Sequence, residues 1–170
     1  MALSKIDSTN MIEDVPQSKL DNNINFRNLI INGGMDIAQR GTSQASAGST
    51  DGSYDTVDRF MFAKLNLGAF TQSQSTDVPT GQGFANSLKM DCTTADASPA
   101  AGDYLQFTQH VEAQNLQYLK FGTSNATSLT LSFWVKSNKT GTYCFDIRSL
   151  DSARLISKTY TINSANTWEK

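Results

Sequence analysis

The chain has 170 residues, with 14 basic and 16 acidic side chains and a formal net charge of −2. This length fits about one domain. The near-neutral charge argues against a nucleic-acid-binding protein, which normally carries a basic patch, and against a polybasic membrane-surface protein. No apolar run approaches the roughly 20 residues that cross a bilayer. We therefore expect neither nucleic acid nor a membrane as a partner.

Uncharged polar residues dominate the composition. Ser, Thr, Asn and Gln account for 60 of the 170 residues, whereas only 18% are charged. Ser, Thr and Asn compete with the helical backbone through local hydrogen bonds, so this composition favours turns and strands over long helices. The aromatic residues lie in apolar runs that can bury area, which argues against a disordered chain.

Residues 1–25 differ from the rest of the chain. Their apolar side chains are sparse and follow neither a helical nor a strand period, and Pro16 interrupts any helix there. We expect an extended N-terminal arm that orders itself by docking on another surface, with a free leader as the alternative. The apolar anchors of this arm are Ile6, Met11, Ile12, Val15 and Leu20.

Residues 26–170 predict a domain of short strands. β-Branched and aromatic residues predict strands at 26–32, which Gly33 and Gly34 end, and at 57–67, where both faces are apolar. Residues 84–92 alternate weakly, and a further short strand is predicted at 104–108. Residues 41–53, 71–83 and 93–103 are predicted to be loops because of their polar composition. One helix of about two turns is predicted at 112–119, where Ala113, Leu116 and Leu119 recur at a spacing of three.

The alternation of apolar and polar residues is clearest in the last third of the chain. It predicts strands at 129–135, 142–147 and 155–162, with a turn at 138–141. Short strands joined by turn residues indicate an antiparallel sandwich or barrel. Residues 166–170 resemble the opening of one more strand. We expect either that the chain is a fragment, truncated at its C-terminal end, or that a neighbouring chain completes the exposed edge.

The sequence offers little catalytic chemistry. His110 is the only histidine and lies near no nucleophile motif, and neither a phosphate-binding nor a dinucleotide-binding glycine pattern is present. We therefore expect no enzyme and no cofactor. Clustered Asp51, Asp55 and Asp58 leave calcium binding open, although plain loop formation is the favoured interpretation. The two cysteines, Cys92 and Cys144, are expected to be half-buried free thiols, with a bridge between them as the alternative.

Aromatic side chains are the better candidates for a ligand site. Trp134 alternates with the apolar face of 129–135, and Tyr143 lies across the predicted hairpin. Aromatic faces stack on sugar rings, so Trp134, Tyr143 and Trp168 are the candidate carbohydrate-binding residues. The favoured alternative is that Trp134 packs under a second layer or against a neighbouring subunit.

Two parts of the sequence resemble a known family. Residues 28–43 (NLIINGGMDIAQRGTS) are similar to the N-L-I-I-N-G-x-M-x-x-x-Q-R-G-T-S segment of bacteriophage tail-fibre and related virion proteins, many from marine phages, and residues 58–60 (DRF) resemble its D-R-[WF] partner. Residues 129–137 (LTLSFWVKS), 140–143 (TGTY) and 165–169 (ANTWE) are similar to core strands of those proteins. The resemblance covers about residues 28–170.

The resemblance implies a jelly-roll β-sandwich of the carbohydrate-binding-module type on a virion fibre that is usually a homotrimer. Its implied partners are other phage tail proteins and a host surface glycan, and its implied location is the phage tail, after synthesis in the host cytoplasm. No catalytic residue carries over. By the motif, Gly33 and Gly34 make the turn, and Arg40 and Arg59 are expected to pair with Asp36 and Asp58.

Two other functions compete with a virion fibre. One is a carbohydrate-binding module of a polysaccharide-active protein. The other is a glycosidase or depolymerase, which needs two carboxylates flanking the scissile bond, and the sequence marks out no such pair.

Overall fold

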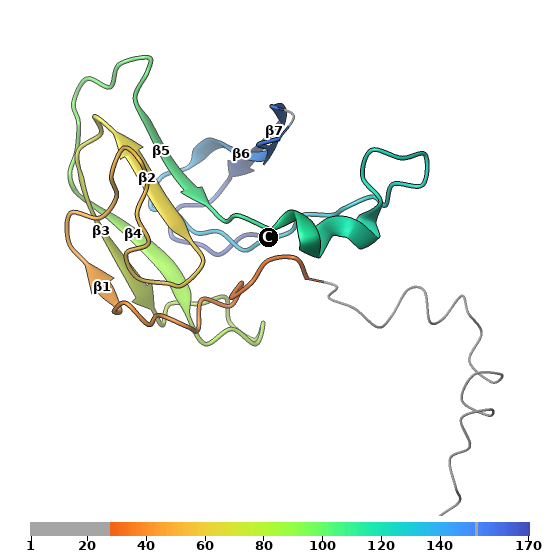
Figure 1. Ribbon diagram of the computed structural model, residues 1–170. Coiled ribbons are helices and arrows are strands. Elements are labelled where there is room, and N and C mark those ends of the chain that lie inside the picture. The colour runs from red at the N-terminus through yellow and green to blue at the C-terminus, as the bar shows by residue number, and fades with distance from the viewer. Residues whose placement is uncertain (1–27, 152) are drawn as a thin grey trace, which may run out of the picture.

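The structure is a computed structural model, and it describes residues 28–151 and 153–170 (Figure 1). The predicted docking arm and its anchors Ile6, Met11, Ile12, Val15 and Leu20 lie outside the described residues. In the part that is described, the chain is mainly β with antiparallel sheets, as the polar composition predicts. No helix in this part has the length and hydropathy that a membrane crossing requires.

Strands and one short helix alternate with long loops along the described chain. The order is β1 (Ser43–Gln44), β2 (Met61–Leu65), β3 (Ala69–Ser75), β4 (Ser87–Thr94), β5 (Tyr104–Thr108), the 3₁₀ helix η1 (Ala113–Leu119), β6 (Gly141–Ser149) and β7 (Arg154–Ile162).

The strands form three small antiparallel sheets. β3 lies between β1 and β4, β2 pairs with β5, and β6 pairs with β7 along its whole length. Figure 1 shows β2 and β5 lying over the β1–β3–β4 sheet, while η1 and the loop after it project away from the sheets. This arrangement is compatible with a β-sandwich.

Phe62 of β2 is at the centre of the core. Its ring is fully buried, stacks on Phe107 of β5 at 5.1 Å, and meets Phe70 of β3 edge-on at 6.0 Å. Because Phe70 and Phe107 belong to different sheets, the Phe62 ring joins the two sheets. Ala63, the next residue, is also buried, which confirms that both faces of this strand are covered, as its sequence predicts.

The predicted strand at 26–32 is wrong for its described residues, 28–32. Asn28 caps the backbone of Ile30, and Asn32 adopts a positive φ of 57° that ends extended structure. The side-chain amide of Gln109 accepts from the Ile31 N–H and donates to the Ile31 carbonyl, each at 2.8 Å. A side chain from a distant part of the sequence therefore satisfies the backbone groups that a neighbouring strand would otherwise satisfy.

The predicted loop at 71–83 is wrong for its first five residues, which belong to β3, and is confirmed for residues 76–83. The first five residues are polar, but a strand between two partners satisfies its backbone whatever the side chains are. Gln72 is fully buried, and its Oε1 accepts from the Thr56 hydroxyl at 2.9 Å.

The last third of the chain confirms two of its three predicted strands. β6 and β7 cover the predicted strands at 142–147 and 155–162. Earlier in the chain, β5 has the predicted bounds, 104–108. The predicted strand at 129–135 does not form: only Val135 pairs, in an isolated bridge to Glu169, because no strand among the described residues lies beside 129–134. The predicted helix is present, and its spacing of three matches the 3₁₀ period.

Candidate functional site

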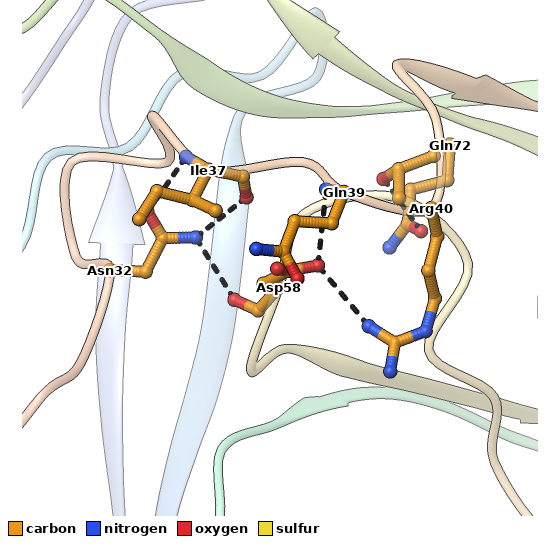
Figure 2. A network of polar contacts seen from close by, with 7 residues as sticks. Asn32, Ile37, Gln39, Arg40, Asp58 and Gln72 are labelled. Atoms are coloured by element: carbon orange, nitrogen blue, oxygen red, sulfur yellow. Dashed lines mark hydrogen bonds and ion pairs between the residues drawn. The ribbon is translucent and has the colours of Figure 1, made fainter.

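The first resemblance segment folds into a polar network around Asn32 (Figure 2). Its side-chain amide donates to the carbonyls of Ile37 and Asp58, at 2.9 and 3.0 Å, and its Oδ1 accepts from the Ile37 N–H at 3.1 Å. One side chain thus closes the loop 32–37 on itself and ties it to a segment 26 residues further along the chain. Its role is structural.

Asp58 extends this network towards the surface. Its Oδ1 accepts from the Gln39 N–H at 3.3 Å and from Nη1 of Arg40 at 3.2 Å (Figure 2). The expected pairing is therefore confirmed for Arg40, which pairs with Asp58, and wrong for the other two residues: Arg59 pairs with Glu112 at 2.8 Å, and Asp36 accepts from Asn86. Exposed ion pairs of this kind contribute about 0–1 kcal/mol to the free energy of unfolding, so their main effect is to fix the positions of the loops they join.

We expect Asn32→Ala to lower the free energy of unfolding by about 1–3 kcal/mol, because two carbonyls and one N–H lose their partner. The substitution also places alanine at a positive φ, which Asn tolerates better. Asn32→Gly removes the same hydrogen bonds without that strain, so it should be less destabilising. Urea unfolding of both variants separates the cost of the lost hydrogen bonds from the cost of the backbone strain. Equal stability of Asn32→Ala and the unmodified protein would contradict the structural role.

A small polar cleft opens beside this network. It has a volume of about 260 Å³ and is lined by Gln39, Arg40, Tyr54, Asp58 and Arg59. The Arg40 guanidinium lies 5.6 Å from the centre of the Tyr54 ring, which is partly exposed. The cleft therefore combines an aromatic face, an amide, two cations and a carboxylate, the groups that bind a hydroxylated or anionic ligand.

His110 and Glu112 lie next to this cleft. Nδ1 of His110 is 3.5 Å from the Tyr54 hydroxyl, and Nη2 of Arg59 donates to the His110 carbonyl at 3.0 Å and to Glu112 at 2.8 Å. The Arg59 guanidinium beside Glu112 lowers the pKa of that carboxyl below its ordinary value. Sequence reasoning missed this group as a site, because Tyr54 and His110 are 56 residues apart and belong to no shared motif.

The three predicted ligand-binding aromatics lie in and around the β6–β7 hairpin, not in this cleft. The Tyr143 ring stacks on Tyr160 at 5.7 Å, and its hydroxyl is within hydrogen-bonding distance of Ser137. Trp168 is half-buried, and its Nε1 donates to Asp77 at 3.0 Å. Trp134 is half-buried in the unpaired segment before β6. Tyr143 and Trp168 therefore have protein partners.

Asp77 holds the loop after β3 to the C-terminal part of the chain. Its carboxylate accepts from Lys136 Nζ at 2.5 Å and from the Trp168 indole, and the hydrogen bond from Lys136 is the main cause of its lowered pKa. A carboxyl with a lowered folded-state pKa stabilises the fold above its ordinary pKa, and this contribution is lost as the pH falls below it.

We expect acidification below about pH 4, the ordinary range of an aspartate, to loosen the Trp168 contact and change the tryptophan emission. Asp77→Asn keeps an acceptor for the indole but loses the pair with Lys136. It should weaken the acid dependence, leaving the part that Glu112 and Glu169 contribute through their own lowered pKa values. An unchanged acid titration of Asp77→Asn would contradict this assignment.

The candidate metal and thiol groups do not come together. Asp55 accepts from the Gly48 N–H and the Ser53 hydroxyl, whereas Asp58 belongs to the Asn32 network. Among residues 28–151 and 153–170, no three His, Cys, Asp or Glu side chains are close enough to hold a metal ion. Cys92 and Cys144 are free thiols, and both are exposed rather than half-buried.

The chain matches no known protein family, no curated protein and no solved structure. The resemblance of its two segments to phage virion proteins therefore stays a prediction.

Proposed function

We propose that this chain is a non-enzymatic structural protein of a phage virion, part of a trimeric tail fibre that serves host attachment. In this proposal the domain is a jelly-roll β-sandwich, and residues 1–25 dock on other tail proteins. The β-sandwich then faces the host cell. Because the fibre has three copies of the chain, weak binding at each single site adds up to a stronger attachment.

The observation that carries the proposal is the large amount of exposed apolar surface. Scattered exposed apolar side chains are normal, but gathered ones mark surfaces that a partner covers. Here Ile147 and Ile156 lie opposite each other in the β6–β7 ladder, with 47% and 59% of their area exposed, so they share one exposed apolar face of the hairpin. The other exposed large apolar side chains from residue 129 onward are Leu129, Leu131, Leu150 and Leu155.

The polar network supports the same proposal. The resemblance segments 28–43 and 58–60 are separate in sequence, yet Asn32, Gln39, Arg40 and Asp58 from them form one set of contacts. Side chains that fix loops to one another in this way are suited to a structural protein, which must keep a rigid shape.

Light scattering coupled to size-exclusion chromatography of the full chain tests this function. We expect a mass of three times 18.6 kDa. A monomer at all concentrations would contradict the proposal.

A carbohydrate-binding module is the second candidate, and the cleft beside Tyr54 favours it. On a glycan array, Tyr54→Ala should abolish binding if the cleft is the sugar site, and Trp134→Ala should abolish it if the predicted aromatics are. Phe84→Ala is the control, because Phe84 is an exposed aromatic outside the cleft. Binding that no variant changes would exclude both sites.

A further inference from the structure

The polar cleft beside Tyr54 contains hydrogen-bonding groups of both kinds that have no protein partner. Asp58 accepts from Gln39 and Arg40 through Oδ1 alone. Its Oδ2 receives no hydrogen bond from any described residue, and it is accessible to solvent. Arg40 donates to Asp58 through Nη1, which leaves its other N–H groups without a hydrogen bond within the described chain, and its side chain is 54% exposed. An acceptor and several donors therefore lie close together and are open to a ligand.

Contacts with the rest of the domain hold both groups in place. The Asp58 carbonyl accepts from the Asn32 side chain at 3.0 Å, while Oδ1 of Asp58 accepts from the Gln39 N–H at 3.3 Å. The Arg40 guanidinium lies over the Tyr54 ring, 5.6 Å from its centre, and Figure 2 shows it reaching toward the Asp58 carboxylate. Because these positions are fixed before a ligand arrives, binding orders few side chains and loses little conformational entropy.

The size and charge of the cleft narrow the class of ligand. Pockets for drug-sized molecules have volumes of about 300–1,000 Å³. The cleft, with about 260 Å³, is smaller and suits a single ring. Arg40 pairs with Asp58, and Arg59 pairs with Glu112, so the charges of these two ion pairs cancel. Because the cleft has no net positive charge and its free carboxylate oxygen repels anions, a carboxylated or phosphorylated ligand is disfavoured.

Neighbouring hydroxyl groups match this arrangement. A hydroxyl both donates and accepts, whereas a carboxylate only accepts and a guanidinium only donates. One hydroxyl of a vicinal pair therefore donates to Oδ2 of Asp58 while its neighbour accepts from Arg40. Hydrogen bonds of this kind, with one charged partner, are stronger than those between neutral groups. The Tyr54 ring, which is 39% exposed and lines the cleft, adds an aromatic surface for the apolar face of a sugar ring.

We propose that this cleft binds one neutral sugar residue through two neighbouring hydroxyls, with Asp58 accepting from one and Arg40 donating to the other. The Asp58 carboxylate excludes acidic sugars. Binding of this kind rests on the function proposed above, attachment to a glycan, but not on the trimeric state of the chain.

The test measures binding of the full chain to an array that holds neutral glycans, their O-methylated forms, and glycans that end in a uronic acid. We expect the chain to bind the neutral glycans and neither of the other two groups. Methylation removes the hydrogen that the sugar hydroxyl donates, and the carboxylate of a uronic acid meets the like charge of Asp58.

Asp58→Asn separates recognition of the ligand from support of the loops. The amide keeps an oxygen for the Gln39 N–H but removes the negative charge. We expect the affinity for neutral glycans to fall about tenfold, because a hydrogen bond to a charged group becomes one to a neutral group. We also expect uronic-acid glycans to bind, because Arg40 then lacks its counter-charge. Damage to the loops alone would produce the first effect without the second.

Arg40→Ala removes the donor instead, and it should lower the affinity for neutral glycans about tenfold. Because the Arg40 side chain is 54% exposed, this variant is expected to fold, which circular dichroism checks. Asp91→Asn is the matched control for the change of charge. Asp91 pairs with Lys89 at 3.8 Å outside the cleft, so this variant should leave both affinity and selectivity unchanged.

Three results would overturn the proposal. They are preferential binding of uronic-acid glycans by the unmodified chain, unchanged binding of neutral glycans in Asp58→Asn or Arg40→Ala, and binding of no glycan at all. The first result would leave carbohydrate binding intact with a different ligand class, the second would place the sugar at another site, and the third would remove glycan binding itself. The mass from light scattering is independent of all three, so the trimeric fibre is tested separately.

Discussion

Phe62→Ala should lower the free energy of unfolding by about 3–5 kcal/mol, the usual cost of replacing a buried phenylalanine with alanine. The ring is fully buried and contacts Phe70 of one sheet and Phe107 of another. Its removal leaves a cavity between the sheets and ends the aromatic contact that joins them. Gly48 lies against the same ring, where an added Cβ would overlap it, so the surrounding backbone already packs closely.

Urea unfolding followed by circular dichroism measures this loss. Phe121→Ala is the control, because Phe121 is 52% exposed and the same truncation there should cost little. A cost for Phe62→Ala no larger than that for Phe121→Ala would show that the two sheets do not depend on this ring.

Gly68→Ala has the second largest expected effect. An added Cβ at this position would overlap the backbone carbonyl of Thr94 on the neighbouring strand β4. This oxygen belongs to the ladder between β3 and β4, where the register shifts between Ala69 and Phe70, so it cannot move without loss of pairing. We expect a cost of about 3 kcal/mol, the upper end of the range for overpacking.

Gly102→Ala is the matched control for this substitution. The same methyl group at Gly102 meets no atom within 4 Å, and the backbone there has no positive φ that would strain alanine. We expect Gly102→Ala to be neutral or slightly stabilising, because alanine restricts the unfolded chain. Thermal unfolding of the two variants measures the difference, and equal melting temperatures would contradict the close approach of Gly68 to Thr94.

The polar cleft could be predicted only in part from the sequence. The motif D-R-F and the segment before it draw attention to Arg40, Asp58 and Arg59, and to Asp58 as a partner of the arginines, but not to the partners that lie further along the chain. Arg59 pairs with Glu112, and Tyr54 meets His110, across more than 50 residues in each case. Contacts between residues so far apart follow from how the loops pack, which no local pattern specifies.

Local pattern alone determined the β-rich class, the short helix η1 and the strands β5, β6 and β7 of the described residues. In these segments the alternation or spacing of apolar residues agrees with the structure that forms. Pairing decided the rest, because a strand needs a neighbour for its backbone as well as a suitable side-chain pattern. Polar β3 is a strand because β1 and β4 lie on either side of it, whereas apolar 129–134 is not a strand because no described segment pairs with it.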